Sequence, residues 1–257
     1  MRGRVALAAG TGLLLLTACS SGVRTVSDAP SGSIPASLAP SSSAVSSSSA
    51  TPTDAGVVVR FTDDFHSSSS GWEAGKLPSG TTFAYGKNSY VVVARGGLNH
   101  TQFAPPRAIT RPGATATFVL PRSAPAGTAV GVFCRGGSDT AGTEIQFLVD
   151  PRAGTWRIEL FSGPLVSTDH TTVFARGRTS TTAGTTPVAV TGRCLTQSGG
   201  KVTRAVLLVD GQVAADRRVA TVPSDAAEWR TGFVVADVGR GATTVLVTSY
   251  ELRFYPA

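Results

Sequence analysis

The sequence predicts an all-β domain, built as a two-sheet antiparallel β-sandwich. From Val57 onward, short runs of β-branched and aromatic residues alternate with Gly, Pro, Asp and Asn, and no stretch carries a helical apolar stripe. About 11 such runs over roughly 200 residues favour two packed sheets. The expected strands cover residues 57–61, 89–94, 115–120, 129–135, 144–150, 155–161, 187–195, 204–209, 212–219, 232–236 and 243–255.

Before this domain, residues 1–18 have the pattern of a bacterial lipoprotein signal peptide. Arg2 and Arg4 precede an apolar core of about 12 residues, which is too short to span a bilayer. The core ends in Leu16-Thr17-Ala18-Cys19, so we expect cleavage before Cys19 and acylation of its thiol, with palmitate among the acyl chains. The alternative is an ordinary cleaved signal with an incidental cysteine. Acylation predicts a protein anchored by lipid at the extracytoplasmic face of the cell membrane.

Residues 19–56 form a predicted flexible linker. This segment is dominated by Ser, Ala, Pro and Thr and has almost no large apolar residue to bury. A flexible chain of about 37 residues spans roughly 35 Å, which suits a spacer between a lipid anchor and a folded domain. The folded domain is then expected over residues 57–257.

Two hairpins follow from alternation and turn residues. Residues 144–150 and 155–161 place Ile, Phe, Val and Trp on one face and charged residues on the other, with a turn at residues 151–154. Asp210-Gly211 predicts a tight type I′ turn between the next two strands. In the last strand we expect Leu246, Tyr250, Leu252 and Phe254 on one side and Val247, Glu251 and Arg253 on the other.

Cys134 and Cys194 lie in phase with the apolar residues of their strands, so both thiols should point inward. In an exported chain this favours a structural disulfide over two separate buried thiols. A redox role is disfavoured because there is no Cys-x-x-Cys and no histidine nearby in sequence.

The order of landmarks resembles exported actinobacterial domains of the concanavalin A-like lectin/glucanase superfamily. The residues that carry the resemblance are 61–65 (FTDDF), 69–72 (SSGW), 131–135 (GVFCR), Cys194 with 207–211 (LLVDG), and 232–234 (GFV). The resemblance implies a jelly roll, but not a function, because that superfamily includes lectins, glycosidases, sensory ectodomains and adhesion modules. In the opening motif, Asp63 and Asp64 are expected to cap backbone amides and Trp72 to be buried. Calcium binding by the aspartates and ligand stacking on Trp72 remain alternatives.

No motif in the sequence indicates a particular catalytic reaction. Glycoside hydrolysis needs two carboxyl groups about 5 to 9 Å apart, and the Glu-x-Asp-x-x-Glu pattern of the resembling glycanases is absent. His66, His100 and His170 lack metal-ligand spacing, and no nucleophile, phosphate or dinucleotide motif occurs. We therefore expect no catalytic residues, no metal and no cofactor. The net charge of +7 comes from scattered arginines, which argues against nucleic acid as a partner.

The outward face of the first hairpin is the best candidate for a ligand surface. Arg135, Gln146, Arg157 and Glu159 should project there from neighbouring strands, with hydrogen-bonding groups suited to sugar hydroxyls or acidic groups. The alternative is an ordinary hydrophilic face, and Glu144 could approach Glu159 across it. The sequence thus favours a lipid-anchored, non-catalytic module that binds a cell-envelope glycan or another exported protein. Its rival is a glycoside hydrolase acting on wall or environmental polysaccharide.

Overall fold

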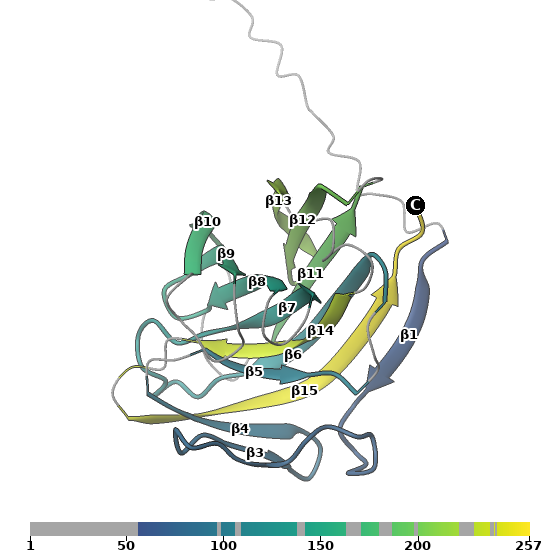
Figure 1. Ribbon diagram of the computed structural model, residues 1–257. Helices are drawn as coiled ribbons and strands as arrows, with labels where there is room; N and C mark the ends of the chain where they lie inside the picture. The colour runs from purple at the N-terminus through teal and green to yellow at the C-terminus, as the bar shows by residue number, and fades with distance from the viewer. Residues whose placement is uncertain are drawn as a thin grey trace, which may run out of the picture. The chain divides into compact units, whose positions relative to one another are not determined.

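The computed structural model describes residues 56–96, 99–105, 109–137, 142–162, 171–179, 187–197, 200–220, 229–236, 239 and 241–257. Within these ranges the chain forms two antiparallel sheets and no helix (Figure 1). The predicted signal peptide, Cys19 and the linker up to residue 55 lie outside the described residues. In the part of the chain that is described, no helix is long and apolar enough to cross a membrane.

The larger sheet has nine strands. They are β1 (Val58–Asp63), β2 (Gly75–Lys76), β3 (Thr82–Tyr85), β4 (Tyr90–Arg95), β6 (Pro112–Val119), β11 (Val188–Thr196), β12 (Val202–Val209), β13 (Gln212–Ala220) and β15 (Ala242–Phe254). Their order is β13-β12-β11-β6-β15-β4-β3-β2, and β1 pairs with β15. The chain therefore enters and leaves the domain in one strand pair, since Val58 lies opposite Phe254.

The smaller sheet has six strands. They are β5 (His100–Phe103), β7 (Ala129–Gly137), β8 (Gly142–Asp150), β9 (Thr155–Ser162), β10 (Thr171–Arg178) and β14 (Trp229–Ala236). Their order is β10-β9-β8-β7-β14-β5. The two sheets stack on each other, which confirms the predicted all-β sandwich (Figure 1).

All 11 predicted strands are present, and four further strands were missed. β2 and β3 have two and four residues, which is too short for a clear alternation. β5 has the polar sequence HTQF, and β10 has TTVFARGR with exposed residues on both faces. β10 lies at the edge of its sheet, where neither face has to be apolar throughout.

Both predicted hairpins are confirmed. β8 pairs with β9 across the turn at residues 151–154, with Phe147 opposite Ile158. β12 pairs with β13, and their turn places Asp210 at φ 49° and Gly211 at φ 78°. Two successive positive φ angles are the signature of a type I′ turn.

The predicted faces of the last strand are partly wrong. Val247, expected on the face opposite Tyr250, is buried in the core together with Tyr250. Leu246, expected on the same face as Tyr250, points to the other face. The cause is a β-bulge between Val247 and Ser249 in the pairing with β6. One extra residue in a strand reverses the alternation on either side of it.

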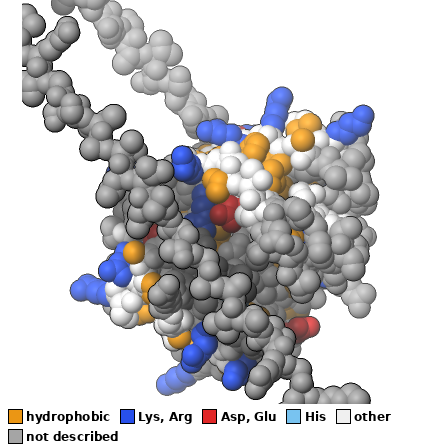
Figure 2. Space-filling view, turned by 60° about the vertical axis from the view of Figure 1, so that its left-hand side comes forward, with side chains coloured by type: hydrophobic (Ala, Val, Ile, Leu, Met, Phe, Trp, Pro, Cys, Tyr) orange, Lys and Arg blue, Asp and Glu red, His pale blue; other side chains and the backbone are white. Residues whose placement is uncertain are grey.

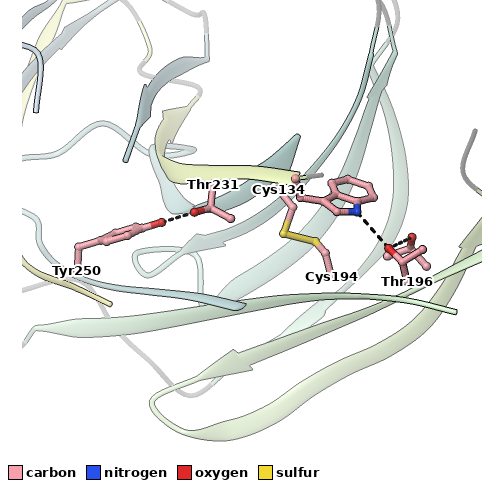
Figure 3. Close-up of a disulfide and its surroundings, with 7 residues drawn as sticks. Cys134, Cys194, Thr196, Thr231 and Tyr250 are labelled. Carbon is pink, nitrogen blue, oxygen red and sulfur yellow. Dashed lines mark hydrogen bonds between the residues drawn. A yellow bond between two sulfur atoms is a disulfide. The ribbon is translucent and has the colours of Figure 1, made fainter. Parts of the chain in front are cut away.

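The predicted disulfide joins Cys134 of β7 to Cys194 of β11, with 6.5 Å between the two Cα atoms (Figure 3). It links the two sheets through the core. Two hydrogen bonds close beside it: the Trp229 indole donates to Thr196 Oγ1 at 3.1 Å, and the Tyr250 hydroxyl donates to Thr231 Oγ1 at 2.8 Å. Buried polar groups in this region are thus paired rather than left unsatisfied.

The opening motif has the expected structural role. Asp63 accepts the backbone N–H of Phe65 at 2.7 Å and the indole N–H of Trp72 at 2.8 Å. Trp72 is only 4% exposed and packs against Phe65, Tyr250 and Phe233. Its ring is therefore part of the core, and it offers no surface on which a ligand could stack.

Candidate functional site

The four predicted ligand residues lie on one face of the six-stranded sheet, the face that points away from the larger sheet and is called here the outer face. Arg135 of β7 lies opposite Glu144 of β8, and Gln146 of β8 lies opposite Glu159 of β9. Arg157 follows two residues before Glu159 on the same strand. The structure thus brings all four side chains together on three adjacent strands, as the alternation predicted.

Their predicted exposure, however, is wrong for three of the four. Arg135 is 1% exposed, Gln146 is 4% and Glu159 is 7%, and only Arg157 is partly exposed. The physical reason is a second apolar cluster on the outer face, where the central strands are buried on both sides. Its members are Ala129, Phe133, Leu148, Val234 and Ala236, with Phe103 packed against them.

A signal for this second cluster is present in the sequence. Strands buried on both faces have unbroken apolar runs, whereas half-exposed strands alternate. β8 contains Phe147-Leu148-Val149, and β14 contains Phe233-Val234-Val235-Ala236. These runs predict burial of both faces, whereas alternation alone predicts an exposed outer face.

The buried polar residues of the outer face form a network. The Gln146 amide donates to Glu144 Oε1 at 2.6 Å, and the Asn99 amide donates to Gln146 Oε1 at 2.8 Å. Arg135 Nη1 lies 3.6 Å from Glu144 Oε2, and its guanidinium stands over the ring of Phe161. Burial raises the pKa of Glu144, while the hydrogen bond from Gln146 and the charge of Arg135 oppose that rise.

Glu159 is held separately. Arg157 Nε donates to Glu159 Oε1 at 2.6 Å, so this carboxylate has a cation of its own strand beside it. In the strand register Glu159 lies diagonal to Glu144, with Gln146 between them. The second carboxylate that alternation places on this face of β8 is Asp150, at the end of the strand, and it accepts the backbone N–H groups of Gly127, Arg152 and Ala153. The network is well built to hold the face in one conformation.

An open pocket of about 440 Å³ lies at the β5 edge of the same sheet. Its lining combines Phe103 of β5 and Arg230 of β14 with Glu73, Lys76 and Gln102. The Arg230 guanidinium stacks over the Phe103 ring, 4.1 Å from its centroid. A planar cation over an aromatic ring, beside a carboxylate, an ammonium and an amide, offers directed hydrogen bonds around a flat surface.

Sequence reasoning missed this pocket. Its residues come from β5, from β14 and from the segment leading into β2, and β5 and β2 were not among the predicted strands. Phe103 is further fixed by an edge-to-face contact with Phe133, whose centroid is 5.0 Å away. The pocket wall is therefore continuous with the apolar cluster of the outer face.

No protein-family model matches the chain, and no curated protein matches it. Solved structures do. A glycoside hydrolase family 16 endo-glucanase from Bacteroides ovatus matches with a TM-score of 0.52 at 10% identity, over 75% of this chain and 99% of the other. The alginate lyase Aly36B matches with a TM-score of 0.50 at 11% identity, over 74% and 95%.

The metal-free carbohydrate recognition domain of Emp46p also matches, with a TM-score of 0.50 at 10% identity, over 74% of this chain and 90% of the other. Identities this low establish shared architecture and not shared chemistry. Together with the two antiparallel sheets, they show that this chain has the concanavalin A-like jelly-roll fold.

Proposed function

We propose that this protein is a lipid-anchored, non-catalytic module of the cell envelope that binds a glycan in the pocket at the β5 edge. The observation that carries the proposal is the stacked pair of Phe103 and Arg230 beside Glu73, Lys76 and Gln102. Sugars are bound by planar polar side chains and flat surfaces that complement their hydroxyl groups. By their names, the endo-glucanase, the alginate lyase and the recognition domain all act on or recognise carbohydrate, which supports the same ligand class at the level of the fold.

The anchor in this proposal rests on the N-terminal sequence. Arg2, Arg4, the apolar core and Cys19 match a lipoprotein signal, and the Ser-rich segment after Cys19 suits a spacer. A glycan-binding domain on such a tether would act at the extracytoplasmic face of the membrane, within reach of wall polymers.

The test is a glycan array probed with the full chain. We expect the wild type to bind one or more envelope or environmental glycans, and Arg230→Ala to weaken that binding at least tenfold, or about 1.4 kcal/mol. The matched control is Arg122→Ala, because Arg122 is an exposed arginine outside the pocket lining. Equal losses in both variants would reject the pocket. No binding to any glycan would instead favour another exported protein as the partner.

A second candidate, a glycoside hydrolase, is favoured by one observation. Burial raises the pKa of Glu144, and a raised pKa is what a general acid of such an enzyme needs. Glu159, its diagonal neighbour, would have to supply the second carboxylate. We expect the full chain to release no reducing ends from wall polysaccharides. Release that Glu144→Gln and Glu159→Gln each abolish, while Arg122→Ala retains it, would establish the hydrolase.

A further inference from the structure

Two edge strands lie beside each other at the open side of the sandwich. β10 is the outermost strand of the six-stranded sheet, β13 is the outermost strand of the nine-stranded sheet, and the two are in contact. Each carries two exposed arginines, Arg176 and Arg178 on β10 and Arg217 and Arg218 on β13. Figure 2, in which the left-hand side of Figure 1 comes forward, shows lysine and arginine side chains at the top, left and bottom of the view, next to exposed hydrophobic side chains and with few acidic ones in view.

Positive charges of β10 and β9 face one another across this pair of strands. Arg176 lies directly opposite Arg157 of β9, and Arg178 follows on the same face, opposite Thr155. Like charges in directly opposed positions destabilise a sheet. β10 contains no acidic residue, and the nearby carboxylate of Glu159 already accepts from Arg157. Arg176 and Arg178 are thus exposed cations beside the Arg157–Glu159 pair.

On β13 a single carboxylate stands among three arginines. Arg204 of β12 donates through Nε to Asp216 at 2.8 Å, and Arg218 lies opposite Arg204 in the register. The hydrogen bond from Arg204 holds the pKa of Asp216 below its usual value, and the charges of Arg217 and Arg218 add to that effect. Ala205 and Val219 point into the core, so their neighbours Arg204 and Arg218 point away from the six-stranded sheet. The charges of β12 and β13 therefore lie on the opposite face of the sandwich from Arg176 and Arg178.

The spacing of these arginines fits a polymer better than a single ion. Alternate residues of a strand are about 7 Å apart, and paired strands of one sheet about 4.8 Å, so Arg157, Arg176 and Arg178 form a row on the outer face of β9 and β10. Guanidinium groups pair with carboxylate and phosphate oxygens in bidentate geometry. We propose that this row on β9 and β10, at the edge of the six-stranded sheet, binds an acidic polysaccharide, a chain whose sugars carry carboxylate or phosphate groups.

Exposed apolar side chains complete this surface. Val173 is 51% exposed and Phe174 38%, and both lie on β10. They offer sugar rings an apolar contact between the charges, but they are too few for the broad apolar face of a membrane-surface element. The net charge of +7, which falls to +5 once Arg2 and Arg4 are removed with the proposed signal peptide, also favours polyanions through long-range attraction. The surface is distinct from the β5 pocket and extends the proposed carbohydrate binding to a second site.

The experiment measures binding of the full chain, in detergent, to polygalacturonate, with the uncharged glucan pullulan as the reference polymer. The variant Arg176→Glu/Arg178→Glu should weaken binding to polygalacturonate by about tenfold or more and reduce its salt dependence. The matched control Lys87→Glu/Arg122→Glu changes the net charge equally at exposed positions away from this edge, and it should weaken binding less than threefold, roughly 0.6 kcal/mol. Thermal melting of each variant verifies folding.

Three results would overturn the inference. The first is an equal loss of polygalacturonate binding in both double variants. The second is no polygalacturonate binding by the wild type. The third is that Arg176→Glu/Arg178→Glu loses binding to phosphatidylglycerol vesicles but keeps its binding to polygalacturonate. Arg230→Ala separates the two proposals, because it should leave polygalacturonate binding unchanged while weakening the glycan found on the array. Either site can therefore fail while the other stands.

Discussion

Trp72 donates its indole N–H to the carboxylate of Asp63 at 2.8 Å, and this bond fixes the largest side chain of the opening segment in the core. The other oxygen of Asp63 accepts the backbone N–H of Phe65, which has a positive φ of 58°. One carboxylate thus holds both an unusual backbone conformation and a buried indole.

Asp63→Ala should lower the free energy of unfolding by about 2–4 kcal/mol, because it leaves two buried donors without an acceptor. Asp64→Ala is the matched control, since Asp64 is exposed, and it should change stability by less than about 0.5 kcal/mol. Urea denaturation of both variants measures the difference. Similar effects at the two positions would refute this role of Asp63.

Removing the disulfide should destabilise the sandwich strongly. Cys134 and Cys194 are 60 residues apart, and closing a loop of that size restricts the unfolded chain by on the order of 4 kcal/mol in the chain-entropy model. Cys134→Ala/Cys194→Ala, followed by chemical denaturation, tests this. Reduced wild-type protein should show a loss in the same direction, and a double variant as stable as the wild type would contradict the expectation.

The stability of the domain should depend on pH through His100. Burial lowers the pKa of His100, and the hydrogen bond between His100 Nε2 and the carbonyl oxygen of Arg95, 3.0 Å long, partly opposes this shift. Because the folded state disfavours the protonated ring, the contribution of His100 is present above the ordinary pKa of 6.5 and is lost as the pH falls below it.

We therefore expect His100→Gln to lose less stability than the wild type between about pH 7 and pH 5. His100→Asn is the companion variant, and it should show the same reduced slope as His100→Gln, because neither amide side chain titrates in this range. Thermal melting across this pH range measures both. The same slope in all three proteins would show that His100 does not set it.

Gly131 of β7 should not tolerate a side chain. A Cβ atom there would lie 1.8 Å from the backbone oxygen of Phe147 on the neighbouring strand, and backbone cannot move away as a flexible side chain can. Gly131→Ala should cost about 3 kcal/mol or more, or prevent folding. Gly75→Ala, whose Cβ would meet nothing within 4 Å, should be close to neutral, and melting temperatures of the two variants give the comparison.

Cys19→Ser tests the lipid anchor. Without the thiol, acylation cannot occur, so the protein should be released into the medium or remain unprocessed. Cell fractionation and mass spectrometry of the N-terminus distinguish these products from the acylated chain. A processed form of the variant that stays with the membrane would contradict the lipoprotein interpretation.

The fold was predictable wherever the pattern is local. Apolar alternation located both hairpins, and Asp210-Gly211 predicted the type I′ turn that their positive φ angles confirm. Cys134 and Cys194 were in phase with their strands and do form the disulfide. Where local regularity fails, prediction failed too: the bulge near Val247 reversed the expected faces of β15, and β10 was missed because its residues are exposed on both sides.

For the candidate sites, the sequence predicted which residues share a face but not whether that face is exposed. The sequence by itself determined that Arg135, Gln146, Arg157 and Glu159 share a face, because alternation along paired strands requires it. Only the tertiary structure decided that this face is largely buried, that the open pocket forms around Phe103 and Arg230, and that β10 and β13 meet. The physical reason is that the side on which a residue points is set by the backbone of its own strand, whereas burial, pockets and charge clusters depend on which distant segments fold against it.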